Sequence, residues 1–148
     1  MKYFNELFSN EIIGISILSW FIAQVIKIII DLVKTKSLDF ELIVSSGGMP
    51  SSHSSFVTAL FTNVGLREGF DSPLCAICFV LSMVVMYDAA GVRRAAGKQA
   101  KVLNQILADF EHKNYKVDEK LKELLGHTPI EVAAGALLGI IVACVCYF

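Results

Sequence analysis

The sequence predicts an all-α fold: a single domain of residues 1–148 that forms an integral membrane bundle of about four spans. Three observations predict this class. Apolar residues make up 55% of the chain and charged residues 18%, against about 45–50% and 25% in soluble domains. Mean hydropathy is +0.61, and long stretches carry almost no charge. The formal net charge of −1 argues against a general binder of nucleic acid.

The first two spans differ in length. The first, about residues 11–34, begins with an uncharged run, and its apolar pattern continues past Lys27 and Asp31. The second, about residues 52–67, has an apolar part, His53 to Leu66, that makes only about 21 Å of helix at ~1.5 Å per residue. Since the hydrocarbon core is ~30 Å thick, we expect this helix to start below the headgroups or to be shielded by its neighbours.

The third and fourth spans, about residues 72–90 and 128–148, are almost uncharged. Residues 92–126 connect them. Apolar residues recur there at helical spacing from Val92 to Phe110 with basic residues between them. This pattern predicts an amphipathic cytoplasmic helix that lies on the membrane surface or against the base of the bundle. A second short amphipathic turn is expected before Gly126, which would cap it.

Basic residues are distributed unevenly between the two sides of the predicted bundle. Ten of them lie in the first and third connections, whereas Lys2 and Arg67 lie on the opposite side. The positive-inside rule therefore predicts that these two connections are cytoplasmic and that both termini are outside. We expect a protein of the cytoplasmic (plasma) membrane.

Polar residues gather at the cytoplasmic end of every span. They are Lys27, Asp31 and Lys34 on the first span, Ser45 to Ser54 before the second, Asp88, Arg93 and Arg94 after the third, and His127 and Glu131 at the start of the fourth. Ionisable groups at membrane depth are costly and usually functional. Because successive spans alternate in direction, all of these clusters fall on one side of the membrane.

Each cluster also fits a purely structural interpretation. Lys27 and Asp31 have the spacing of a simple ion pair along a helix. The serine-rich segment fits a loop that ends in a serine N-cap, and the two arginines fit membrane anchors. Thr128, Pro129 and Glu131 fit a capping box at a helix start.

Together the clusters predict an anion site. Glycines and helix N-termini offer backbone N–H groups to an oxyanion, and lysine and arginine supply positive charge. One histidine can attack phosphorus, a second can protonate the leaving oxygen, and a carboxylate can orient the first. We expect neither a metal nor a cofactor, because a magnesium site needs several clustered carboxylates and this side offers Asp31, Asp88 and Glu131 near the spans.

These residues resemble the motifs of the type 2 phosphatidic acid phosphatase superfamily, which includes vanadium-dependent haloperoxidases, and in particular its divergent small membrane branch. The first motif is a lysine followed seven residues later by arginine-proline. Lys27 and Lys34 match its spacing, with lysine for arginine. Pro50-Ser51-Ser52-His53 matches the Pro-Ser-Gly-His motif, with serine for glycine.

His127 and Glu131 match the end of the third motif, with glutamate for the family's aspartate. The family has an arginine six residues before this histidine, where the present chain has Leu121. Arg93 or Arg94 would therefore have to serve across an insertion of about thirty residues.

The resemblance implies a metal-independent phosphatase that acts through a phosphohistidine. It implies His127 as the nucleophile, Glu131 as its orienting carboxylate and His53 as the general acid. The residues implied to hold the phosphate are Lys27, Lys34, Ser51, Ser52 and one of Arg93 and Arg94. Apart from the resemblance, we expect Asp31 and Asp88 to support the site.

The leading hypothesis is hydrolysis of a lipid or polyprenyl phosphate monoester at the cytoplasmic leaflet. One alternative is a non-catalytic binder or carrier of lipid phosphate headgroups that keeps the anion site. Another is a structural subunit that uses Gly135 and Gly139 as a helix-packing face. The expected partners are the bilayer and its lipid phosphate, and a homodimer is compatible with so small a bundle.

Overall fold

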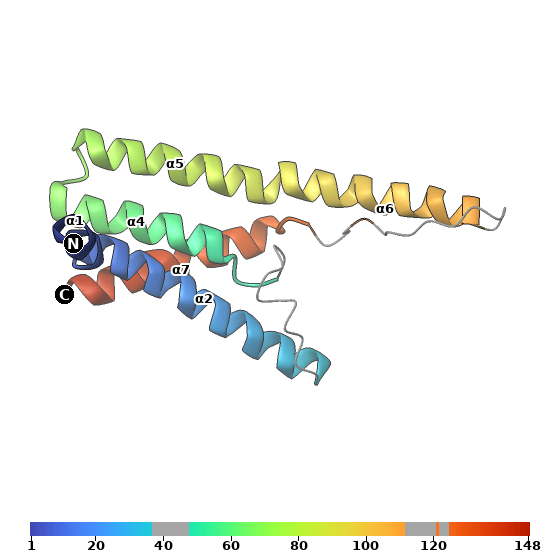
Figure 1. The fold of residues 1–148 in the computed structure, drawn as a ribbon, viewed down its shortest axis with the longest axis horizontal. Coiled ribbons are helices and arrows are strands. Elements are labelled where there is room, and N and C mark those ends of the chain that lie inside the picture. The colour runs from blue at the N-terminus through green and yellow to red at the C-terminus, as the bar shows by residue number, and fades with distance from the viewer. Residues whose placement is uncertain (37–47, 112–120, 122–124) are drawn as a thin grey trace.

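The computed structural model describes residues 1–36, 48–111, 121 and 125–148, and every regular element within them is a helix. The helices are α1 (Lys2–Phe8), α2 (Glu11–Thr35), α4 (Ser52–Glu68), α5 (Pro73–Ala90), α6 (Val92–Glu111) and α7 (Pro129–Tyr147). α2, α4, α5 and α7 lie alongside one another, and both termini lie at the same end of the bundle (Figure 1). The predicted all-α membrane bundle is confirmed.

Helices occur at all of the ranges expected to span the membrane, but they are not equivalent. Within the described residues, three helical stretches are long and apolar enough to cross a bilayer. They are α2, α7 and the stretch Pro73–Ala108, which comprises α5 and most of α6. α4 has 17 residues and is more polar than α2, α5 and α7. It contacts α2, α5 and α7, so its neighbours shield it from lipid, as its short apolar run led us to expect.

Small hydroxyl side chains join α4 to its three neighbours. Ser55 on α4 and Ser19 on α2 lie with their Oγ atoms 2.6 Å apart. Thr58 donates to the Ala136 carbonyl of α7 at 3.1 Å, and Ser82 of α5 donates to the carbonyl of Val57 on α4 at 2.9 Å. Small residues let helix backbones approach closely in a membrane, and hydroxyl groups hydrogen-bond across the interface.

Two glycines determine how closely α7 packs on α4. A Cβ atom at Gly135 would collide with the backbone carbonyl of Ser51, and one at Gly139 would collide with the Thr58 hydroxyl and the Ser55 carbonyl. The glycine face expected of a structural subunit is therefore occupied by α4 of the same chain. The structure gives this face no free surface for another subunit.

The amphipathic helix expected between the third and fourth spans is present as α6. It follows α5 in nearly the same direction and projects beyond it (Figure 1). Among the described helices it contacts α5, so it does not pack against the base of the bundle, which was one of the two expected placements. The N–H of Ala95 donates to the carbonyl of Gly91 at 2.9 Å, so helical hydrogen bonding resumes at once after the junction. The expected second amphipathic turn lies outside the described residues, apart from Leu121 and Leu125, which are not helical.

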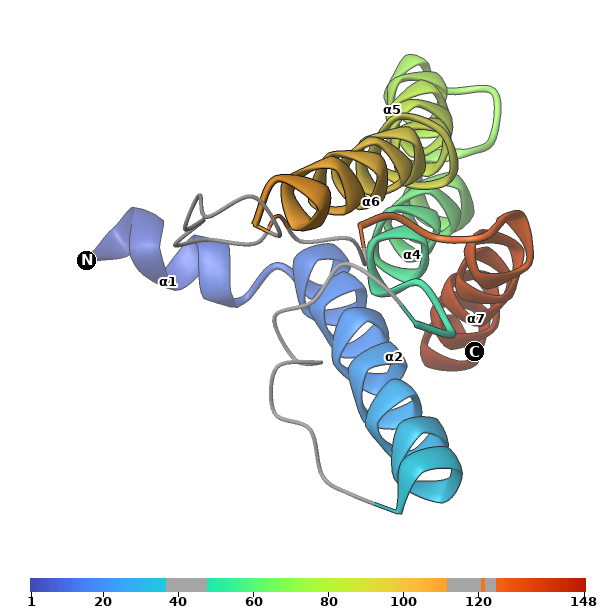
Figure 2. The same ribbon diagram turned by 90° about the vertical axis from the view of Figure 1, so that its right-hand side faces the viewer.

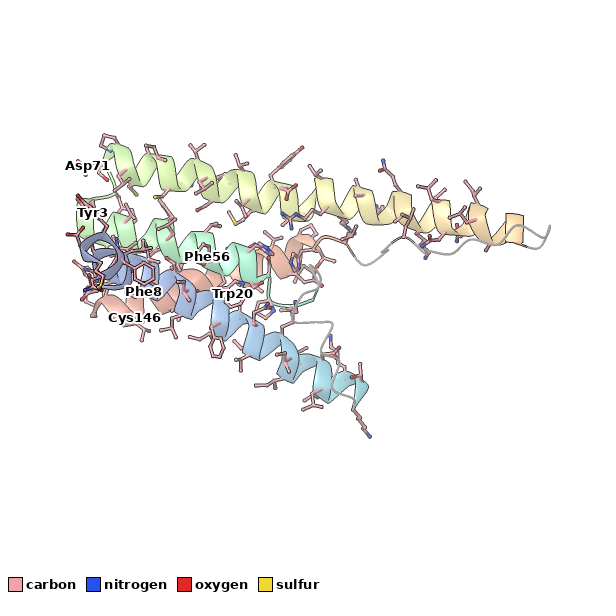
Figure 3. The ribbon with its side chains drawn as sticks, in the orientation of Figure 1. Tyr3, Phe8, Trp20, Phe56, Asp71 and Cys146 are labelled. Atoms are coloured by element: carbon pink, nitrogen blue, oxygen red, sulfur yellow. The ribbon has the colours of Figure 1, made fainter. Side chains whose placement is uncertain are left out.

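α1 was not predicted from the sequence. It leaves the start of α2 sideways, away from the bundle (Figure 2). Its side chains include Tyr3 and Phe8, which lie at the terminal end of the bundle (Figure 3) and are 83% and 74% exposed. Aromatic side chains are enriched where a membrane meets water, which suits a short helix at the edge of the bilayer.

We predict that Gly139→Leu lowers the free energy of unfolding by about 1–3 kcal/mol, because the added side chain overpacks the contact between α4 and α7. Unfolding of the purified protein in mixed detergent micelles measures this loss. The matched control is Ala133→Leu, which adds a similar volume at an exposed position of the same helix. Equal stability of the two variants would contradict the packing role of Gly139.

Candidate functional site

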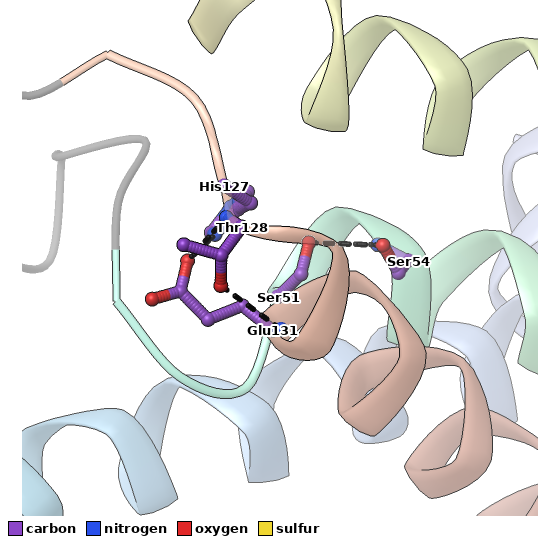
Figure 4. Close-up of polar contacts among 5 residues, drawn as sticks. All are labelled: Ser51, Ser54, His127, Thr128 and Glu131. Carbon is purple, nitrogen blue, oxygen red and sulfur yellow. Dashed lines mark hydrogen bonds and ion pairs between the residues drawn. The ribbon is translucent and has the colours of Figure 1, made fainter.

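His127 lies directly before α7 and is held by the end of α5. Its backbone N–H donates to the carbonyl of Ala89 at 2.9 Å. Its imidazole Nδ1 lies 3.3 Å from Oε2 of Glu131 (Figure 4), and the ring is also hydrogen-bonded to the backbone of Gly48. The residue is 3% exposed. Backbone and side chain are therefore both fixed.

Gly126 brings the chain to His127 along a close path over the start of α6. Its φ is +86°, a left-handed conformation that favours glycine. A Cβ atom at this position would collide with the backbone of Arg93 and Arg94. From the sequence, Gly126 was expected only to cap a helix. The hydrogen bond to the Ala89 carbonyl gave no sequence signal, because it involves no particular side chain.

Glu131 makes the contacts expected from both interpretations that the sequence allowed. Its backbone N–H donates to Thr128 Oγ1 at 3.3 Å, and its Oε2 accepts from the Thr128 N–H at 2.9 Å, which completes a capping box. The same Oε2 lies against His127. The structural and functional interpretations are therefore not alternatives, since one carboxylate caps the helix and contacts the imidazole.

The serine motif is joined to the start of α7 through the backbone. The N–H of Ser51 donates to the carbonyl of Glu131 at 3.0 Å. Ser51 is the N-cap of α4, and its Oγ accepts from the Ser54 N–H at 3.4 Å. Ser51 and Ser52 are buried whereas His53 is exposed. The hydroxyl of Ser51 is thus used for capping, and the α4 N-terminus directs its first N–H groups toward this end of the bundle.

The lysines of the first motif share a small cavity with the loop that precedes α4. The cavity has a volume of about 60 Å³, and its lining residues are Lys27, Ile30, Asp31, Lys34, Gly48 and Met49. Lys27 is buried, with 3% exposure. Gly48 has a φ of +94° and would place a Cβ 3.1 Å from the Lys27 side chain. A glycine at this position therefore leaves room for the lysine stem.

The clusters from separate helices are close enough for their charges to act on one another. Lys27 interacts electrostatically with Glu131 and with His127. The charged groups that act on His53 are Arg93, His127, Lys27 and Asp88. The structure therefore brings together one end of α2, of α4 and of α5 with the start of α7. This agrees with the prediction that all of the polar clusters lie on one side of the membrane.

The two arginines differ in their surroundings. Arg93 Nε lies 2.6 Å from Asp88 Oδ2 in a half-exposed ion pair, and its charge acts on His53. Arg94 is exposed, and its described contact is that of its backbone with Gly126. Of the two arginines, Arg93 is the one whose charge acts on a histidine of the candidate site.

Burial controls the charge of His127. It lowers the pKa of the imidazole, because a charged ring loses hydration when it is buried. The hydrogen bond and the charge of Glu131 raise the pKa and partly offset this effect, while the nearby Lys27 lowers it further. A neutral imidazole at neutral pH is the form that can act as a nucleophile.

The described part of the chain contains no group of three or more His, Cys, Asp or Glu side chains arranged to hold a metal ion.

Comparisons with known proteins agree with this architecture. Residues 8–142 match the family described as the Divergent PAP2 family. The chain is 45% identical to the uncharacterized membrane protein YuiD of Bacillus subtilis (strain 168), over 95% of this chain and 96% of that protein. No solved structure gives a significant match.

We predict that the pKa of His127 lies below the value of about 6.5 found for an unperturbed histidine, and that Glu131→Gln lowers it further by removing a group that favours the charged ring. Lys27→Met should raise it, since a neighbouring positive charge is lost. Titration of the imidazole Cε1–H signal by NMR measures all three. A wild-type value above that of the free side chain would contradict the described burial.

Proposed function

Because the chain belongs to the divergent PAP2 family, we propose that it hydrolyses the phosphate monoester of a membrane lipid or polyprenol through a phosphohistidine. The observation that carries the proposal is the position of His127, which is oriented by Glu131 beside the buried Lys27 and within electrostatic range of His53. No metal is needed in this scheme, because cationic side chains supply the charge that faces the phosphate.

The proposed first step forms a bond between His127 and phosphorus. An Nδ1–H that donates to Glu131 leaves the lone pair on Nε2 for attack. Lys27, Lys34 and Arg93 neutralise the phosphate oxygens, and the N–H groups at the start of α4 add to them. As the bond from phosphorus to the lipid oxygen breaks, a protonated His53 gives its proton to the leaving oxygen.

In the second step water hydrolyses the phosphohistidine. The now neutral His53 takes a proton from the water, the P–N bond breaks, and inorganic phosphate leaves while His127 returns to its starting form. The same two histidines therefore complete the cycle. Asp31 and Asp88 have supporting roles in this scheme, Asp88 through its ion pair with Arg93.

One observation favours the second candidate function, a binder or carrier of lipid phosphate headgroups. The imidazole of His127 is hydrogen-bonded both to Glu131 and to the backbone of Gly48. If both ring nitrogens are engaged, no lone pair is available until a substrate displaces Gly48. A protein in which that displacement never occurs would bind the anion through the same cationic residues without turning it over.

We predict that purified protein releases phosphate from lipid monophosphates in the presence of EDTA, that vanadate inhibits this release as a transition-state mimic, and that His127→Ala abolishes it. Retained binding of a phosphate analogue by a folded His127→Ala variant serves as the control. Binding without release by the wild-type protein would support the carrier. Wild-type rates in His127→Ala would eliminate the phosphohistidine.

We predict that Arg93→Ala lowers kcat/KM by about 10²-fold, which corresponds to roughly 2.7 kcal/mol of transition-state stabilisation. The neighbouring Arg94→Ala is a matched control, since it removes the same charge one position along the helix and should have little effect. Steady-state hydrolysis of one lipid phosphate by both variants measures the difference. A larger loss of kcat/KM in Arg94→Ala than in Arg93→Ala would show that Arg94 contacts the phosphate.

We propose that the site faces the cytoplasm, because the basic residues of α6 lie beyond the same end of the bundle, and each is worth about 1 kcal/mol at an anionic cytoplasmic surface. We predict that alkaline phosphatase fused after Phe148 is active in cells. A fluorescent protein inserted near Lys113 should fluoresce. An inactive phosphatase fusion, together with a cytoplasmic reporter that works at the same terminus, would show that the C-terminus and not the site faces the cytoplasm.

A further inference from the structure

An apolar groove lies between α2, α4 and α5. Its volume is about 480 Å³, and its lining residues are Ile17 and Trp20 of α2, His53, Phe56 and Val57 of α4, and Val85 of α5. This volume falls within the ~300–1,000 Å³ typical of small-molecule sites. Trp20 and Phe56 mark its position in the middle of the bundle (Figure 3).

The groove opens toward the bilayer and also reaches the candidate site. Ile17 and Trp20 are 51% and 37% exposed, and exposed side chains at this depth of a membrane helix face lipid. At its other limit the lining includes His53, and the charges of Arg93, His127, Lys27 and Asp88 act on its imidazole. The space therefore has an apolar wall and ends at a histidine of the candidate site.

We propose that this groove holds a hydrocarbon chain of the phosphate-bearing lipid, with the phosphate at His53 and the chain between α2 and α5. The inference rests on the proposed function and deepens it: the substrate enters sideways from the bilayer, and the chain contributes to recognition. A phosphate covalently joined to a hydrocarbon is the ligand whose charge and polarity match both parts of the space.

Charge complementarity favours this occupant over the others that a membrane offers. A helix from a second copy of the chain would fill the apolar wall but would bring no anion to His53. A zwitterionic bulk lipid carries a phosphate diester together with a cation, which the neighbouring Lys27 and Arg93 would repel. A monoester phosphate has the full negative charge and no such cation.

Trp20 makes the proposal directly measurable, because it is the single tryptophan of the chain. The wild-type protein is placed in phosphatidylcholine nanodiscs and titrated with an alkylphosphonate that carries bromine in its chain. The carbon–phosphorus bond keeps the probe intact. We expect saturable quenching of Trp20 fluorescence that unbrominated alkylphosphonate reverses and the corresponding alcohol does not.

The groove is tested by two matched variants on α5. Val85→Phe fills the groove, and we expect the half-saturating probe concentration to rise about tenfold or more, as for a steric change in an apolar pocket. Val84→Phe adds the same volume at a neighbouring position that is 61% exposed and should bind like the wild type. If Val85→Phe does not fold, Ile17→Phe narrows the groove from α2, with the exposed Leu18→Phe as its control.

Three results would overturn the proposal. The first is quenching that rises linearly with probe concentration, as non-specific quenching by brominated phosphatidylcholine does. The second is equal binding of the probe by the groove variant and its control. The third is quenching that disappears when the protein dimerises, which would mean that a second copy of the chain fills the groove. Failure of the proposed function is distinguishable from these outcomes. Saturable binding that Val85→Phe weakens, in a protein that releases no phosphate, would support the groove and reject hydrolysis. Phosphate release that Val85→Phe leaves unchanged would support hydrolysis and reject the groove as the site of the hydrocarbon chain.

Discussion

The close approach of α7 to α4 is the constraint on which the candidate site depends. Without side chains at Gly135 and Gly139, the backbone of α7 lies directly against α4. The two helices start at the same level, where the Ser51 N–H donates to the Glu131 carbonyl. A wider spacing would break this bond and move Glu131, together with the imidazole it contacts, away from the α4 N-terminus. The packing of two residues that carry no side chain therefore sets the geometry of the charged residues.

The same packing explains why the central helix can be both short and polar. A lipid-exposed helix must present an apolar surface about as long as the hydrocarbon core is thick. α4 does not face lipid in that way, because α2, α5 and α7 surround it, and hydroxyls such as those of Ser55 and Thr58 find partners on those helices. Relieved of the length requirement, α4 can begin inside the bundle and present its N-terminus and His53 there.

The sequence was sufficient for every described helix except α1 and for the common side of the clusters, since hydrocarbon thickness, charge asymmetry and alternating span direction act on local composition. It was insufficient where geometry depends on helix phase or direction. An amphipathic pattern reports the apolar face of α6 but not that the helix continues α5 beyond Gly91. Arg93 and Arg94 are indistinguishable by composition, yet they point in different directions on the helix, and Asp88 pairs with Arg93. α1 is too short to give a periodic signal.

The glutamate that replaces the family's aspartate has a local physical reason. Residue 131 is the third position of α7, from which a glutamate side chain reaches back to the N-cap N–H, and Glu131 makes this bond to Thr128 at 2.9 Å. From there the same oxygen lies 3.3 Å from His127. An aspartate, one methylene shorter, could reach the Thr128 N–H or the His127 imidazole at this spacing, but not both. The longer side chain ties the orientation of the candidate nucleophile to the stability of the helix start, so disturbance of either one disturbs the other.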